Sequence, residues 1–193
     1  LMVKGGDVEW AGGATRIAKT IGVTPEPKAQ AIIQAANDAT AVLRNKVIGE
    51  QAIDIKRDPA RLSESAMGNL VADAMRSKYP GVDVALANSG GLRADLVVTP
   101  PAAGEAPGEV TWGEVFAVLP FANRTVIATY TGAQIRVALE NGTSPNCNPA
   151  IHSGRTPQLS GMRITFTCNG LVPVITGMWL TPAGIGGPET PVT

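Results

Sequence analysis

Residues 82–93 read Val82-Asp83-Val84-Ala85-Leu86-Ala87-Asn88-Ser89-Gly90-Gly91-Leu92-Arg93. The first six form a mainly apolar run that predicts a buried strand, and the glycines after it predict a turn. These glycines can adopt positive φ without a Cβ penalty and bring bare backbone close to whatever lies beyond the strand. Asn88 and Arg93 add an amide and a planar guanidinium to the same rim. On this stretch alone, a ligand-binding turn and a plain tight turn both remain open.

The segments around this turn alternate irregularly between helices and strands. Thr24-Pro25-Glu26 is typical of a helix start, and apolar residues at helical spacing extend that helix to about Leu43. Further helices are expected over 65–77, from the capping box at 111–114 to about residue 119, and from the capping box at 131–134 to Gly142. Strands are expected at 47–49 with 52–55, at 125–130, at 163–167 and at 172–180. This order predicts an α+β fold, a mixed sheet with flanking helices.

The 193 residues suffice for one sizeable domain. We expect that domain at 24–181, after a linker or the tail of a preceding unit at 1–23 and before a flexible Pro/Gly-rich tail at 182–193. Lys+Arg and Asp+Glu are both 16, so the basic excess of a nucleic-acid-binding protein is missing. No apolar stretch is long enough to span a bilayer.

Two cysteines, Cys147 and Cys168, each lie among polar, turn-forming residues. Buried structural thiols normally have apolar neighbours, and metal or redox pairs are more often closely spaced. A disulfide between them is therefore favoured over two free thiols. It would add about 3 kcal/mol in the chain-entropy model and would indicate an oxidising compartment, so we expect a secreted, periplasmic or cell-surface protein.

The sequence lacks the residues that most hydrolytic sites need. His152 is the single histidine, and a lone loop histidine is more often solvated than a ligand. A di-metal site needs several imidazoles and carboxylates. No G-x-S-x-G elbow or Walker-A spacing is present. We therefore predict no catalytic residue, metal site or cofactor in this chain.

Two other segments carry candidate binding residues. Arg61 lies just ahead of the helix expected at 65–77, where a phosphate would meet both a guanidinium and helix N–H donors. From the local sequence alone, a solvated charge ahead of the helix is the favoured interpretation of Arg61. Phe121 follows a helix end in a loop, where it is either a core side chain or a stacking platform for a base.

Together these segments resemble the C-terminal domain of the 5′-nucleotidase family, secreted or periplasmic metallophosphoesterases that include UDP-sugar hydrolases. The resemblance covers about residues 25–166. It is carried in order by Arg61-x-x-Glu64-Ser65-Ala66-Met67-Gly68-Asn69-Leu70-Val71-Ala72-Asp73-Ala74, Asn88-Ser89-Gly90-Gly91-Leu92-Arg93, Gly113-Glu114-Val115-Phe116-Ala117-Val118-Leu119-Pro120-Phe121, Thr131-Gly132 and Pro157-Gln158-Leu159-Ser160-Gly161.

The resemblance implies a two-domain parent that hydrolyses nucleoside phosphates to nucleoside and phosphate. An N-terminal metallophosphoesterase domain, whose tail would be residues 1–23, would hold two divalent metal ions and perform the hydrolysis. This domain would bind the nucleotide: Arg61 and Arg93 would contact phosphate, Asn88 would contact substrate, and Phe121 would stack on the base. Gly90 and Gly91 would allow close approach.

The family's Gly-Gly-Asp-Gly turn, which supplies a second stacking ring and a ribose contact, is not in this sequence. It would follow Thr193, so we expect a domain truncated at its C-terminal end, inactive alone and binding nucleotides weakly. Two alternatives remain open: a non-catalytic cell-surface or interaction module that kept the fold, and a hydrolase domain for cyclic nucleotides or UDP-sugars.

Overall fold

The computed structural model describes residues 2–10, 12, 21–99, 105–151, 155–184 and 186–193. The chain divides into two compact units, Leu1–Thr40 and Ala41–Thr193, and each is described by itself. The first unit contains an antiparallel hairpin of β1 (Met2–Lys4) and β2 (Asp7–Trp10). Its turn is Gly5-Gly6, with φ values of 62° and 95°. Consecutive positive φ values are what a two-residue hairpin turn requires, and glycine supplies them without strain.

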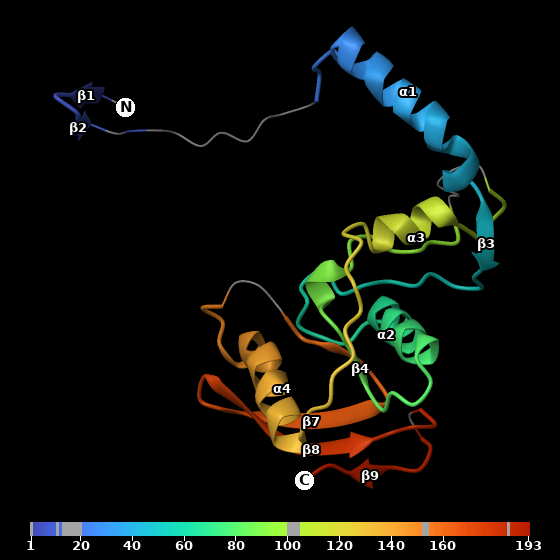
Figure 1. The fold of residues 1–193 in the computed structure, drawn as a ribbon, viewed down its shortest axis with the longest axis vertical. Helices are drawn as coiled ribbons and strands as arrows, with labels where there is room; N and C mark the ends of the chain where they lie inside the picture. The colour runs from blue at the N-terminus through green and yellow to red at the C-terminus, as the bar shows by residue number, and fades with distance from the viewer. Residues whose placement is uncertain (1, 11, 13–20, 100–104, 152–154, 185) are drawn as a thin grey trace. The chain divides into compact units, whose positions relative to one another are not determined.

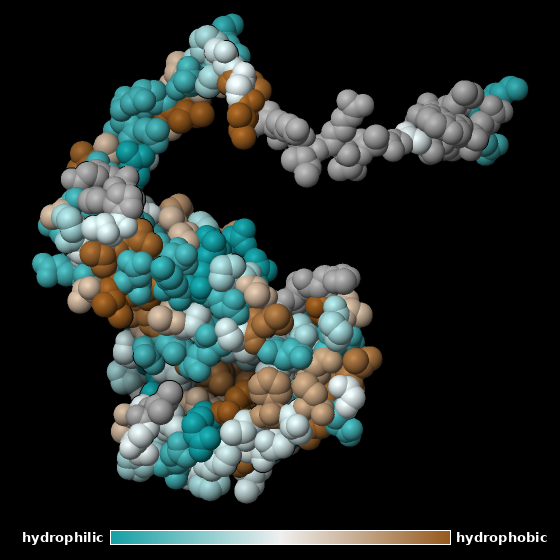
Figure 2. All heavy atoms as spheres, turned by 180° about the vertical axis from the view of Figure 1, so that it is seen from behind, coloured by the Kyte–Doolittle hydropathy of each residue, from teal (hydrophilic) through white to brown (hydrophobic). Residues whose placement is uncertain are grey.

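Helix α1 (Pro27–Arg44) begins two residues later than predicted. Glu26, not Thr24, closes its first turn. The Glu26 carbonyl accepts from Gln30 N at 3.0 Å, and the Glu26 carboxylate accepts from Ala29 N at 2.6 Å. Pro27 therefore takes the first helical position, where its missing N–H costs nothing. None of the helix residues is buried, and its apolar side chains are visible on the surface in Figure 2.

The second unit combines helices with small sheets, which confirms the predicted α+β class (Figure 1). Among the described residues its strands pair antiparallel and are divided among the sheets β3–β5, β4–β6 and β7–β8–β9, rather than gathered in one mixed sheet. The helices are α2 (Ala66–Lys78), α3 (Trp112–Val118) and α4 (Gly132–Cys147). The strands are β3 (Val47–Glu50), β4 (Ala85–Ala87), β5 (Glu109–Thr111), β6 (Gln158–Ser160), β7 (Met162–Asn169), β8 (Val172–Leu180) and β9 (Thr190–Pro191).

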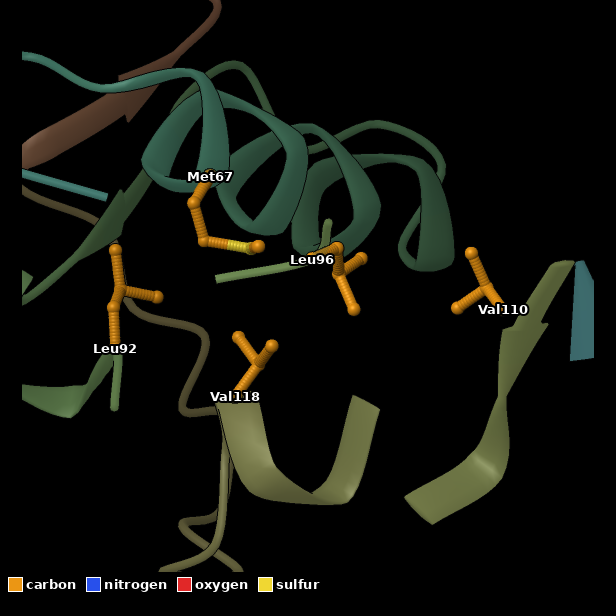
Figure 3. Packing of buried hydrophobic residues seen from close by; sticks show 5 residues of the cluster. All are labelled: Met67, Leu92, Leu96, Val110 and Val118. Carbon is orange, nitrogen blue, oxygen red and sulfur yellow. The ribbon is translucent and has the colours of Figure 1, made fainter. Parts of the chain in front are cut away.

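Two apolar clusters hold these elements together. One joins α2, α3 and β5 to the segment that follows the Asn88 turn, and its side chains point toward one another in Figure 3. The other packs α4 against β7 and β8. Because Leu92 directly follows the glycines and is only 2 % exposed, the first cluster also anchors the turn. The buried members are Met67, Leu92, Leu96, Val110 and Val118 in the first cluster, and Leu139, Met162, Ile175 and Met178 in the second.

The two predicted capping boxes are confirmed. A further cap is Ser65, which accepts from Gly68 N at the start of α2. Both capping boxes form, Thr111 with Glu114 at α3 and Thr131 with Gln134 at α4. Each box satisfies two backbone donors that a helix start otherwise leaves unpaired.

The predicted stop of α4 at Gly142 is wrong, because the helix continues to Cys147. Gly142 instead lets Pro157 pack closely against α4, because a Cβ at position 142 would lie 2.9 Å from Pro157 Cδ. Pro145 lies inside the helix and has no N–H for the Asn141 carbonyl. The Ser144 hydroxyl donates to that carbonyl at 2.7 Å, which lets the helix continue past the proline.

Two predicted strands are also wrong. Residues 52–55 do not pair with β3, whose partner is β5; Ile55 forms an isolated bridge with Leu96. Residues 125–130 alternate like a strand but form none. Among the described residues no strand pairs with them, and Val126 and Tyr130 are 83 % and 64 % exposed. Alternation yields a strand only where a neighbour can accept its hydrogen bonds.

Contacts link the segment 182–193, predicted as a flexible tail, to the β7–β8 hairpin. Strand β9 lies in it and pairs with β8. The Arg163 guanidinium donates twice to the Glu189 carboxylate, at 2.7 and 2.6 Å, and lies 4.0 Å from the centre of the Trp179 ring. A two-pronged ion pair of this kind fixes orientation as well as charge.

The predicted disulfide is present in the structure. Cys147 at the end of α4 is joined to Cys168 in β7, with their Cα atoms 5.4 Å apart. The bond closes a loop with a sequence separation of 21 and links the helix to the sheet on which it packs.

Replacing both Cys147 and Cys168 by serine is expected to lower the free energy of unfolding by about 3 kcal/mol, because the unfolded chain regains the entropy of an open loop. In a domain of this size that corresponds to a fall in Tm of roughly 10 °C. Thermal denaturation with and without reductant measures it. Two reactive thiols in denaturant without reductant would contradict the bond itself.

Candidate functional site

The Asn88 turn is a single turn of 3-10 helix at Ser89–Gly91. Gly91 N donates to Asn88 O at 3.1 Å, and Leu92 N donates to Ser89 O at 3.2 Å. Neither glycine has a positive φ, so the conformational freedom predicted for them is not used. Gly91 instead leaves room for the Asn88 side chain, since a Cβ at position 91 would lie 3.1 Å from Asn88 Oδ1.

Backbone bonds fix this turn to its neighbours. Arg93 N donates to Val118 O at 2.9 Å, which ties the turn to the end of α3 and hence to the loop that carries Phe121. On another side, Arg57 Nη1 donates to Leu92 O at 3.3 Å and Arg57 Nε lies 3.4 Å from the Asp95 carboxylate. The turn is therefore positioned before any ligand arrives.

The loop that carries Arg61 is wrapped around the Asp58 carboxylate. That carboxylate accepts from the backbone N–H groups of Ala60, Leu62 and Ser63 at 2.8–2.9 Å and from the Ser63 hydroxyl at 2.8 Å. Burial pushes the pKa of Asp58 upward, but the hydrogen bonds outweigh it and the pKa lies below its usual value. Asp58 is therefore ionised at neutral pH, and the loop around it holds Arg61 at a left-handed φ of 60°.

Gln158 joins this loop to the segment before β6. Its side chain is fully buried, and its oxygen accepts from Ser65 N at 2.9 Å and from Ser65 Oγ at 3.0 Å. Its amide nitrogen donates to Ser63 O and to Thr156 O, both at 3.1 Å. Thr156 N in turn donates to Arg61 O at 3.0 Å. All the polar capacity of one buried side chain is thus used to fix the backbone on both sides of Arg61.

Three of the six predicted substrate-binding residues, Arg61, Asn88 and Gly90, line one cavity of about 470 Å³. Arg61 lies against the turn, because a Cβ at Gly90 would be 3.5 Å from Arg61 Nη1. Helix α4 and the segment after it complete the wall. The remaining lining residues are Ser89, Ala138, Asn141, Gly142 and Arg155.

Arg93 and Phe121 do not line this cavity but contact each other. The Arg93 guanidinium lies 5.8 Å from the centre of the Phe121 ring, within range of a cation–π interaction. The ring is 57 % exposed, so Phe121 is not a core side chain and remains available for stacking. The predicted binding residues therefore form two groups near the Asn88 turn: Arg61, Asn88 and Gly90 in the cavity, and Arg93 with Phe121 outside it. The ligand-binding roles of these residues remain predictions.

Five cavity residues are not among the predicted site residues: Ser89, Ala138, Asn141, Gly142 and Arg155. Ser89 lies within the Asn88–Arg93 motif, so the sequence could have indicated it as a site residue. Arg155 precedes Pro157-Gln158, but only the fold shows that this segment reaches Arg61.

His152 lies outside the described residues. Within the described part of the chain, no three His, Cys, Asp or Glu side chains are grouped to hold a metal ion. A search of that part also finds no helix with both the length and the apolar character to cross a membrane.

Comparison with known proteins gives the family to which this α+β domain belongs. The family model described as "5′-nucleotidase, C-terminal domain" matches residues 40–171. The chain therefore belongs to the 5′-nucleotidase C-terminal domain family, which confirms the resemblance.

Named relatives agree with this assignment. The chain is 38 % identical over 149 residues to the trifunctional nucleotide phosphoesterase protein YfkN of Bacillus subtilis, a match that covers 75 % of this chain and 9 % of that protein. It is 35 % identical over 159 residues to the cell wall protein Lmo0130 of Listeria monocytogenes, covering 77 % of this chain and 19 % of that protein.

A solved structure, that of a 5′-nucleotidase precursor from Thermus thermophilus, is also similar. The two share 30 % identity with a TM-score of 0.67, over 86 % of this chain and 31 % of that chain. This chain thus spans less than a third of the length of each of these three relatives.

Proposed function

We propose that this chain is the nucleotide-binding domain of a secreted or cell-surface phosphoesterase that hydrolyses nucleoside phosphates to nucleoside and phosphate. The observation that carries the proposal is the shared cavity of Arg61, Asn88 and Gly90, together with an exposed aromatic residue, Phe121, that contacts Arg93. A guanidinium and amide groups suit phosphate, and an exposed ring suits a base. The disulfide supports an oxidising compartment.

Hydrolysis belongs, in this proposal, to a separate N-terminal metallophosphoesterase domain. The described residues of this chain do not fit the two metal ions that the family implies, since no group of three potential ligands lies among them. We assign the substrate-binding domain to 24–181 and the connection to the metal domain to 1–23. The chain alone is expected to release no phosphate from AMP with Mn²⁺ or Zn²⁺.

An NMR titration of the ¹⁵N-labelled chain with AMP and with adenosine tests binding. Both ligands are expected to shift the amide signal of Phe121, and AMP also those of Asn88 and Gly90. Arg61→Ala is expected to weaken AMP binding about tenfold, the effect of losing a hydrogen bond to a charged group, while adenosine binding stays the same. No shift at these residues with millimolar AMP would overturn the proposal. Release of phosphate from AMP in proportion to the amount of purified chain would also overturn it.

A further inference from the structure

Asn146, near the end of α4, links this helix to the loop that carries Arg61. Its amide nitrogen donates to the Leu62 carbonyl, and its oxygen accepts from the Thr156 hydroxyl at 3.0 Å. The backbone N–H of Thr156 in turn donates to the Arg61 carbonyl at 3.0 Å. The backbone on both sides of Arg61 is thus connected to one side chain of α4. The position of Arg61 therefore depends in part on where the end of α4 places Asn146.

The disulfide fixes this end of α4 to the sheet. Earlier in the helix, Leu139 packs in the second apolar cluster, and the side chains of Arg136 and Glu140 bind the Ile175 backbone at 2.5 and 3.1 Å. Beyond Glu140, the described residues of α4 form no hydrogen bond with β7 or β8. The bond from Cys147 to β7 directly follows Asn146 and is therefore what holds that asparagine in register with the sheet.

Reduction of this bond would release the end of α4 without unfolding the domain. Cys168 is exposed, so the bond lies within reach of a reducing dithiol. The dithiol breaks the S–S bond, supplies two electrons and two protons to form two thiols, and itself becomes a disulfide. A helix end can then open at a much lower free energy than the whole domain. The part of α4 before Glu140 keeps its contacts with β8.

We propose that the Cys147–Cys168 disulfide controls phosphate binding in the cavity through Asn146. With the bond formed, Asn146 holds the Arg61 loop in place for the ligand. With the bond reduced, the end of α4 separates from that loop and the affinity for phosphate falls, because binding must then order the loop as well. The inference rests on the proposed function and adds regulation to it: the site gains its full affinity only in an oxidising compartment.

Titrations of the oxidised chain and of the chain reduced with dithiothreitol test this inference, at a temperature well below the Tm of the reduced form. Reduction is expected to weaken AMP binding about three- to tenfold, the effect of one or two lost hydrogen bonds. Adenosine binding is expected to stay within about twofold, since Phe121 does not line the cavity. Adenosine is also the internal control, because global unfolding would weaken the binding of both ligands equally.

Asn146→Ala tests whether the asparagine transmits the effect. Asn146 is exposed, so its replacement leaves the core intact. The variant is expected to bind AMP as weakly as the reduced chain in both redox states, since its link to the Arg61 loop is already lost. Asn169→Ala is the matched control: it replaces the exposed asparagine beside the other cysteine and is expected to keep the full redox dependence. A redox effect of unchanged size in Asn146→Ala would overturn the inference.

Hydrogen exchange of the Thr156 amide gives a readout that needs no ligand. Reduction is expected to speed this exchange, because the Thr156–Arg61 bond opens more often, and to leave the Ile175 amide, which donates to Glu140, unchanged. Equal AMP affinity in the two redox states, or an equal loss for adenosine, would refute control by the disulfide. If the oxidised chain binds neither ligand, the proposed function is wrong, and the exchange of Thr156 still decides whether the disulfide controls the loop.

Discussion

Gly68→Ala is expected to lower the free energy of unfolding by about 2–4 kcal/mol, the cost of overpacking together with lost buried hydrogen bonds. Gly68 lies in the first turn of α2 and is buried. A Cβ at this position would overlap the Gln158 side-chain amide, far inside the 3.0 Å that real Cβ atoms keep. Alanine is otherwise the better helix former by about 1 kcal/mol, so a loss of stability would be caused by contact, not by helix propensity.

The side chain that must move is the one that fixes the Arg61 loop. If Gln158, which is fully buried, is displaced, its hydrogen bonds to Ser63, Ser65 and Thr156 break. The variant is therefore expected to weaken AMP binding along with stability, since Arg61 loses its fixed backbone. Thermal and denaturant unfolding measure the first effect, and the NMR titration measures the second.

A double-mutant cycle with Gln158→Ala isolates the cause. With the glutamine removed, Gly68→Ala is expected to cost close to nothing, because the coupling energy lies in that one contact. Gly49→Ala is the matched control: no atom of the described residues lies within 4 Å of a Cβ there, so its effect is expected within about 0.5 kcal/mol. An equal cost of Gly68→Ala with and without Gln158 would refute this explanation.

The two capping boxes were predicted correctly because a few neighbouring residues decide them. The Thr111–Glu114 and Thr131–Gln134 boxes satisfy their own backbone donors, so the sequence contains both partners. The partner of β3 could not be predicted, because more than fifty residues, which include α2 and β4, separate β3 from β5. The segment 125–130 shows the same limit: it has the alternation of a strand, but no strand in the described chain lies beside it.

The site residues that lie within a local sequence motif were predictable, and those that only tertiary contacts bring to the site were not. Arg61, Asn88 and Gly90 were found by their local sequence and do share a cavity. Arg155 could not be found in this way, since its place depends on the Thr156–Arg61 hydrogen bond. Gln158 lies in a motif that contributed to the resemblance, but its role as the buried link between two loops became visible only from its four hydrogen bonds.

Phe121→Ala is expected to weaken adenosine binding by about 1–3 kcal/mol, the range for one aromatic ring stacked on a base, or about 5- to 150-fold in Kd. The ring is 57 % exposed, so removing it exposes no core and should leave Tm nearly unchanged. Loss of affinity without loss of stability is the signature of a binding residue. Phe121→Trp keeps an aromatic face and is expected to retain most of the affinity.

Phe116 provides the matched control for this change. It is also an exposed phenylalanine, 48 % accessible, but it stacks on Trp112 with ring centres 5.2 Å apart. Phe116→Ala is expected to leave adenosine binding unchanged. Affinity for inorganic phosphate should survive in Phe121→Ala, because the ring does not line the cavity that contains Arg61, Asn88 and Gly90. If Phe121→Ala binds adenosine as the unmodified chain does, the ring is not a stacking platform, and the base must be recognised elsewhere in the protein.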